Sequence, residues 1–464
     1  MTIPFSFDAL LVFGALSIML LVGVVLRARV ALLQRFLFPA CLIGGLIGLV
    51  GMSIGLIRIP PGDIEHFGFH FFNISFISVG LTSAAGSRHL PGERHVLRGP
   101  LWMALVEGVT LPLQALIGGL VVTAFGLAGR PLFPTFGFLV PLGFTEGPGQ
   151  ALSVGKVWEG FGFTHAATLG LTFAALGFFF AFFVGVPLVN WGIRRGFATF
   201  SDTRPSADVL QGFLPLKSGR PPAGRLPMHS GNIDTLAFQS ALVGLVYVLT
   251  YGFIWLVARF LPPDAAKIIW GFFFFIGMAV ALVVKQLMIR LGVDYLVDPG
   301  VQRRITGWAV DYLIVATVMG IQVVVVWQYI LPIALAAVLS GLATTAVVIY
   351  LGSRMESLHL ERTVAIYGTC TGTISSGLLL LRVVDPEFKT PVAMEIGLMN
   401  VIVVPIILGS MILVNAPVWW DWGMGLTLLV FTLIGLSCLA AIRLLKFWGP
   451  PRFKQKTDDR GMRE

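Results

Sequence analysis

The sequence predicts an all-α polytopic membrane protein, and three observations support that fold class. Apolar residues make up 56% of the 464 residues and charged residues only 12%, whereas soluble domains average about 45–50% and about 25%. The mean hydropathy is +0.88. Runs of about 20 residues with few or no charges, long enough to cross a bilayer as a helix, recur along the chain. So few charges cannot cover a water-exposed surface, and lipid is therefore the expected solvent.

Eleven membrane helices are expected from these runs. They lie at about 8–27, 36–57, 68–87, 99–128, 163–193, 235–258, 267–289, 305–327, 329–352, 390–415 and 423–445. The first lacks a positive region and a small-residue cleavage site, so we expect a membrane helix there and not a removable signal peptide. Two further stretches, 132–158 and 364–384, are interrupted by glycine, hydroxyl and amide residues. We interpret each as a re-entrant hairpin.

The distribution of basic residues predicts the orientation. With the N-terminus outside, the C-terminus in the cytoplasm and each hairpin returning to its own side, 27 of the 32 lysines and arginines lie inside. The five outside are Arg58, Arg130, Lys156, Arg259 and Lys267. Cytoplasmic loops carry such an excess. Counting either hairpin as a spanning helix would largely abolish the bias, so the count favours the hairpins as well. It also explains the net charge of +9 without a nucleic-acid partner.

Two halves with matching plans follow from this arrangement. Residues 1–195 form a first repeat of five helices and one hairpin, and residues 235–416 form a second repeat of inverted topology. Between them, residues 196–234 carry five prolines and are expected to be a cytoplasmic linker with little order. Residues 417–464 add an eleventh helix and a basic cytoplasmic tail. Cys41, Cys370 and Cys438 lie far apart and form no disulfide or zinc framework.

Inverted repeats with interrupted membrane segments are typical of secondary transporters, whose binding site lies at the breaks near the bilayer midplane. Non-helical backbone is tolerated at that depth only where it is buried in protein or lines an aqueous cavity. Free N–H groups at the start of a half-helix attract anions, and free carbonyl groups at the end of one attract cations.

The hairpin tips supply the candidate substrate-binding residues. These are Thr145, Glu146, Gly147, Gly149, Gln150 and Ser153 in the first hairpin, and Thr369, Thr371, Gly372, Thr373, Ser375 and Ser376 in the second. Pro148 excludes a continuous first helix. We expect the returning half-helix to start near Gln150 and to leave the N–H groups of Gln150, Ala151 and Leu152 free, and we expect the second tip to span Gly368–Thr373. The alternative is that these glycines and serines only allow close helix packing.

Other polar residues within the spans are few. Glu146, Asn73 and Asn400 are the candidate sodium ligands, although both asparagines are equally suited to hydrogen bonds between helices. Glu107, Asp311 and Glu395 lie early in their helices, where structural or snorkelling roles are expected.

Several segments resemble the bacterial sodium/glutamate symporters. Phe161–Gly177 is similar to the family's segment after its first re-entrant loop, Phe38–Leu46 to its second helix, and Val79–Leu81 to its third. The resemblance covers most of residues 8–415. It implies a homodimeric, elevator-type symporter of the bacterial inner membrane that couples Na⁺ to glutamate or a related amino acid or carboxylate. No other cofactor is implied.

The tips depart from that family. Glu146 falls about where the family has a histidine, and an ionised carboxylate there would repel a substrate carboxylate. Our hypothesis is that Glu146 binds a cation or carries a proton when an anionic substrate is bound. An H⁺-coupled carrier and a carrier of neutral solutes therefore remain open. A channel or a membrane scaffold is a weaker alternative. The spans contain no paired aspartates, HExxH or P-loop, so we do not expect an enzyme.

Overall fold

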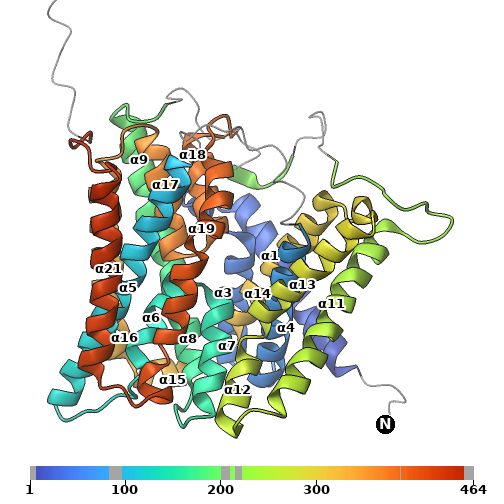
Figure 1. The fold of residues 1–464 in the computed structure, drawn as a ribbon, viewed down its shortest axis with the longest axis horizontal. Helices are drawn as coiled ribbons and strands as arrows, with labels where there is room; N and C mark the ends of the chain where they lie inside the picture. Colours follow the sequence, from blue (N-terminus) through green and yellow to red (C-terminus); the bar gives the residue numbers. More distant parts are fainter. Residues whose placement is uncertain (1–6, 83–96, 200–209, 215–221, 387, 454–464) are drawn as a thin grey trace, which may run out of the picture.

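The computed structural model describes residues 7–82, 97–199, 210–214, 222–386 and 388–453, and all regular elements in these ranges are helices (Figure 1). Eight of the described helices are long and apolar enough to cross a bilayer, judged by length and composition. They are α1 (Asp8–Arg29), α5 (Arg98–Leu127), α8 (Ala166–Phe179) continuing into α9 (Gly185–Arg194), α11 (Thr235–Ala258), α13 (Phe273–Arg290), α16 (Ile330–Gly352), α19 (Val392–Leu413) and α21 (Met424–Leu444). The chain is a polytopic helical membrane protein, as predicted.

The remaining predicted spans are shorter or more polar helices. They are α3 (Ala40–Ser53), α4 (Pro61–Thr82) and α14 (Pro299–Met319). Short helices precede or follow the long ones: α2 (Ala31–Arg35), α12 (Pro263–Gly271), α15 (Val323–Gln328) and α20 (Ala416–Trp419). Residues 83–87 of the third predicted span, parts of the predicted linker (200–209 and 215–221) and the tail at 454–464 lie outside the described residues.

Three predicted spans are less regular than expected. Residues 267–289 divide between α12 and α13, and residues 305–327 divide between α14 and α15. Between α8 and α9 the helix passes through a π-helical segment, Phe180–Val184, that keeps the span continuous. The hydrophobic pattern indicated apolar length at these places, but it does not register a change of helix geometry or direction within an apolar run.

The helices pack as two bundles. One contains α1, α3, α4, α11, α13 and α14, and the other contains α5, α8, α9, α16, α19 and α21 together with the short helices described next. In Figure 1, α11 and α13 lie at the right, α5, α16 and α21 lie at the left, and α8 lies between them. In the apolar stretches, 78% of α5 and 72% of α8–α9 is buried, against 17% of α1 and 22% of α21. Helices α5 and α8–α9 are therefore central.

Both stretches that were predicted to be interrupted are broken in the structure. The first consists of a short 3₁₀ turn (Phe136–Phe138), α6 (Leu139–Phe144) and α7 (Pro148–Glu159), and the second consists of α17 (His359–Thr371) and α18 (Ile374–Val384). The two helices of each pair pack against each other. Figure 1 shows α17 and α18 at the upper end of the molecule, where α16 leads into them, whereas α7 lies in the lower half. The two bundles meet at α7, which packs against α4, α12 and α14, and at α8, which packs against α14.

Close backbone approach fixes α5 against the start of the first broken stretch. A Cβ at Gly118 would overlap the carbonyl oxygen of Gly137, and a Cβ at Gly137 would overlap the backbone of Gly118. By contrast, Gly126 in the same helix has open space around the position of a Cβ.

We therefore expect Gly118→Ala to lower the free energy of unfolding by about 1–3 kcal/mol, because the added methyl group forces α5 and the 3₁₀ turn apart. Gly126→Ala is the matched control, and its effect should be neutral or stabilising by up to about 1 kcal/mol because alanine favours helix. Thermal unfolding midpoints of the two purified variants in detergent test this. Equal midpoints for the two variants would contradict the close approach.

Candidate functional site

Four helix ends meet in the interior of the molecule. These are the C-terminal ends of α6 and α17 and the N-terminal ends of α7 and α18. The Thr145 hydroxyl lies 3.2 Å from the carbonyl oxygen of Cys370 and donates a hydrogen bond to it. A Cβ at Gly147 would lie 3.1 Å from Cγ2 of Thr373. The two breaks, more than two hundred residues apart in sequence, are thus in direct contact.

Gln114 of α5 connects the two breaks. Its Nε2 donates to the Cys370 carbonyl oxygen at 3.0 Å and to the Thr344 hydroxyl at 3.1 Å. Its Oε1 accepts from the Thr145 hydroxyl at 2.8 Å. Gln114 is completely buried. Sequence reasoning missed this residue, although an amide within an otherwise apolar span is the same signal that singled out Asn73.

The first break has the local chemistry that its sequence requires. Gly147 has φ +90°, which favours glycine, and Pro148 opens α7 where an N–H would have no helical acceptor. The Ala151 N–H donates to the Gly147 carbonyl oxygen at 3.2 Å. The prediction that the half-helix starts near Gln150 is therefore wrong by two residues. Pro148 has no N–H, and the Ala151 N–H is already bonded. The free N–H groups of this helix start are therefore those of Gly149 and Gln150.

The second break is shorter than predicted. Helix α17 continues to Thr371, so Gly368–Thr371 is helical and only Gly372 and Thr373 separate it from α18. The hydroxyls of Thr369 and Thr371 donate to carbonyl groups one turn back in their own helix. Hydroxyls in a helix commonly form such bonds, and these two are not free for a solute.

Gly368 was predicted to lie in the tip of the second hairpin, but in the structure it packs against Gly377. A Cβ at Gly368 would lie 2.7 Å from the Cα of Gly377, so the pair allows α17 and α18 to pack closely. This is the packing role that the sequence left as an alternative. The N–H of Gly377 donates to the Thr373 carbonyl oxygen at 3.0 Å. By helix geometry the N–H groups of Ile374, Ser375 and Ser376 have no helical acceptor.

Two carboxyl groups lie beside the breaks without a cation. Gln150 Nε2 lies 3.4 Å from Oε2 of Glu146, whereas Oε1 of Glu146 is buried without a hydrogen-bond partner. Glu107 of α5 is 3% exposed, its Oε2 is also unpartnered, and it lies within electrostatic range of Glu146. Within the described ranges, no lysine, arginine or histidine forms an ion pair with either group. Buried carboxyl groups in this situation require a cation or a proton.

The other predicted site residues differ in burial. Ser153 and Thr373 each have a buried hydroxyl without a hydrogen-bond partner, and Ser376 is buried beside Gly372. Ser375 is exposed on α18. Gly149 lies directly against the ring of Phe72 in α4, where a Cβ would overlap that ring.

The two asparagines proposed as sodium ligands are not joined to this cluster. Asn73 is completely buried on α4 near the hydroxyl of Tyr247 on α11, and neither polar atom of its amide forms a hydrogen bond with a described residue. Asn400 donates its amide to the carbonyl oxygen of Ile396 in its own helix, α19. Of the three candidates, only Glu146 lies at a break.

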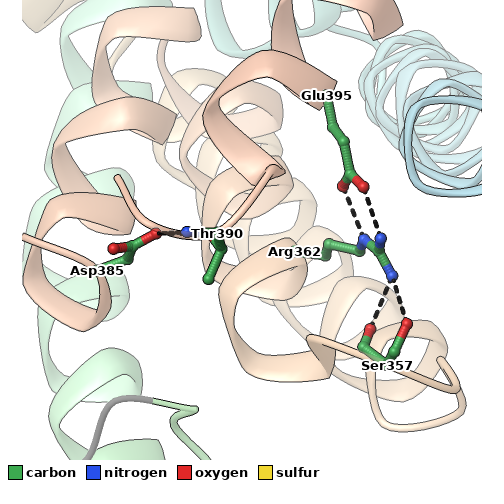
Figure 2. Close-up of polar contacts among 5 residues, drawn as sticks. All are labelled: Ser357, Arg362, Asp385, Thr390 and Glu395. Carbon is green, nitrogen blue, oxygen red and sulfur yellow. Dashed lines mark hydrogen bonds and ion pairs between the residues drawn. The ribbon is translucent and has the colours of Figure 1, made fainter. Parts of the chain in front are cut away.

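A buried ion pair holds the N-terminal end of α17 (Figure 2). Arg362 donates from Nε and Nη2 to the two carboxylate oxygens of Glu395 in α19, at 2.8 and 2.6 Å, and from Nη1 to both oxygen atoms of Ser357. Both charged side chains are more than nine-tenths buried, and Gly99 of α5 packs against the carboxylate. Such a bidentate pair orients its helices, and removal of one partner is strongly destabilising. Glu395 therefore has the structural role expected for it.

Comparison of the chain with protein-family models, with curated proteins and with solved structures finds no match. The chemistry of the site is therefore what indicates a function. Its free N–H groups at two helix starts can bind an anionic group, and its carbonyl groups, carboxylates and hydroxyls can bind a small cation.

We expect Thr145→Val to destabilise the contact between the breaks, because it leaves the buried Gln114 Oε1 without its donor. The expected loss is about 1–3 kcal/mol of unfolding free energy. Thr145→Ser keeps the hydroxyl and should retain most of the stability. Thermal unfolding in detergent measures both, and a Ser variant as unstable as the Val variant would show that the methyl group matters and the hydrogen bond does not.

Proposed function

We propose that the protein is a secondary active transporter that couples entry of a cation, Na⁺ in the first instance, to uptake of glutamate or a related amino acid or carboxylate. The observation on which this rests is the meeting of two broken helices in a buried centre, beside two carboxyl groups without a cation partner. Free helix ends within the membrane are tolerated where they bind a solute or line its cavity.

The packing of the helices supports two inverted repeats. Helix α1 packs on α3 as α11 packs on α13, and α3 packs on α14 as α13 packs on α4. Helices α4 and α14 pack on each other, as do α5 and α16. This is the pattern expected when each helix of the first half exchanges with its counterpart in the second. The broken pairs α6–α7 and α17–α18 then correspond, and we propose that they are re-entrant hairpins entering from opposite faces.

The division into two bundles supports an elevator-type movement. The bundle that contains both breaks contacts the other one at α7, where Gly149 meets Phe72 and Lys156 forms ion pairs with Glu65 of α4 and with Glu159. We propose that the bundle with the breaks carries the bound solute past the bundle of α1, α3, α4, α11, α13 and α14. Contacts of α7 with α4 would then break and re-form in each transport cycle.

The charges at the site determine which co-substrates are feasible. The free N–H groups of α7 and α18 favour a carboxylate, but Glu146 and Glu107 would repel it if both were ionised. A cation or proton bound at these carboxyl groups removes the repulsion. Accumulating an anion against a negative interior requires at least two cations per cycle, since each charge is worth about 2.3 kcal/mol per 100 mV.

The same two carboxyl groups favour a second candidate function. If the groups bind protons and not Na⁺, the protein is an H⁺-coupled carrier, and if they remain ionised, a neutral or cationic solute fits better than an anion. Both alternatives use the same breaks and differ from the first only in what neutralises Glu107 and Glu146.

Uptake by purified protein in proteoliposomes tests the proposed function. Glutamate, aspartate, other carboxylates and neutral amino acids are screened with an inward Na⁺ gradient, an inward H⁺ gradient and neither. We expect saturable uptake of an acidic solute that depends on the Na⁺ gradient. Uptake that is not saturable or ignores both gradients would indicate a channel and refute the proposal.

We expect Glu146→Gln to reduce Na⁺-driven uptake by about tenfold or more, because the neutral amide loses a charge-assisted ligand or a proton acceptor. Glu356→Gln is the control, since Glu356 is exposed and, among the residues that the structure describes, its only ion pair is the surface contact with Arg98. Initial rates, stoichiometry and pH dependence are measured for both variants. An unchanged stoichiometry and an unchanged pH profile in Glu146→Gln would exclude both proposed roles of this carboxyl group.

A further inference from the structure

A polar cavity lies apart from the two breaks, between α2 and the end of α9. Its volume is about 250 Å³. The residues that line it are Arg35, Phe36, Val186, Pro187, Asn190, Trp191 and Arg194. Figure 1 shows the end of α9 at the upper end of the molecule, where the apolar lengths of α5 and α21 also terminate. The cavity therefore lies at the level of a membrane surface.

Arg35 and Arg194 make this cavity strongly cationic. Among the described residues that line it, they are the only ionisable ones. Within the described part of the chain, neither guanidinium forms an ion pair with a carboxylate. Each lies in the last turn of its helix, where a positive charge complements free carbonyl groups. Both arginines are exposed, so their remaining N–H donors are open to water or to an anion that enters the cavity.

The surroundings of the cavity are apolar and aromatic. Phe36 contacts Phe183, with ring centroids 5.0 Å apart, and Phe183 and Leu32 are 43% and 61% exposed. Trp191 packs against Phe197 and Phe453, and its indole borders the cavity. Tryptophan at the level of the headgroups, next to exposed apolar side chains, is typical of residues that face lipid.

We propose that this cavity binds the phosphate headgroup of an anionic phospholipid. Arg35 and Arg194 bind the phosphate from two sides, since guanidinium groups form paired hydrogen bonds with phosphate oxygens. The volume lies just below the range of small-molecule pockets, about 300–1,000 Å³, and therefore suits a headgroup while the acyl chains remain outside. Leu32 and Phe183 provide the apolar surface for those chains. A free phosphate would use the guanidinium groups but not this surface.

Lipid binding to the purified full-length protein in non-ionic detergent tests the proposal. Native mass spectrometry measures the affinity for phosphatidylglycerol and for phosphatidylcholine. We expect preference for phosphatidylglycerol, and a loss of about 30-fold in its affinity in the Arg35→Ala/Arg194→Ala double variant, the effect expected of two basic residues at an anionic headgroup. Each single variant should lose about fivefold, so the proposal stays testable if the double variant does not fold.

Two controls identify the source of any effect. Arg290→Ala removes an exposed positive charge at the end of α13, away from the cavity, and should leave the affinity for phosphatidylglycerol unchanged. An equal loss in Arg290→Ala would show general attraction of anionic lipid and overturn the proposal. Inorganic phosphate and glycerol phosphate are tested by thermal shift. Stabilisation by either that matches phosphatidylglycerol, and is lost in the double variant, would assign the cavity to a soluble anion and also overturn it.

Discussion

Peptide groups released at a helix break have no water to bind in an apolar interior, and most of this structure follows from how they are satisfied. The carbonyl group of Cys370 accepts hydrogen bonds from both Gln114 and Thr145. The carbonyl groups of Gly147 and Thr373 accept the first helical hydrogen bond of the helix that follows, from the N–H groups of Ala151 and Gly377. An unsatisfied backbone group in such surroundings costs several kcal/mol. The two breaks therefore stabilise each other, and α5 passes beside both of them and supplies the Gln114 amide.

The groups that remain unsatisfied after this pairing are the ones that define the chemistry of the site. Oε1 of Glu146, Oε2 of Glu107 and the hydroxyls of Ser153 and Thr373 are buried without partners. They lie in four parts of the chain, namely the first break, α5, α7 and the second break, so a bound cation or solute would draw separate parts of the chain together. This coupling between binding and packing is what a carrier requires, because occupancy must change the free-energy difference between its two orientations.

Two buried contacts outside the site hold neighbouring helices together. The buried pair of Arg362 and Glu395 ties α17 to α19, and the close approach of Gly118 and Gly137 ties α5 to the start of the first broken stretch. Both connections lie within one bundle. Between the bundles, the ion pair of α7 has one partner in contact with water, since Lys156 is half exposed whereas Glu65 of α4 is buried, and Lys156 also pairs with Glu159 of its own helix. An ion pair whose lysine is half exposed and has a second carboxylate within reach is easier to exchange than the fully buried pair of Arg362 and Glu395.

The sequence by itself determined the membrane environment, the approximate positions of the spans and the location of both breaks, because hydrophobic length and the backbone chemistry of glycine and proline are local properties. The sequence predicted that the second break starts at Gly368, whereas it starts at Gly372. The two glycines differ only in what they pack against, which the sequence does not show. It also could not identify Gln114, show that the buried polar atoms of Asn73 and Oε2 of Glu107 lack partners among the described residues, or pair Arg362 with Glu395. Those roles depend on which side chains face each other across helices distant in sequence, and only the tertiary structure decides that.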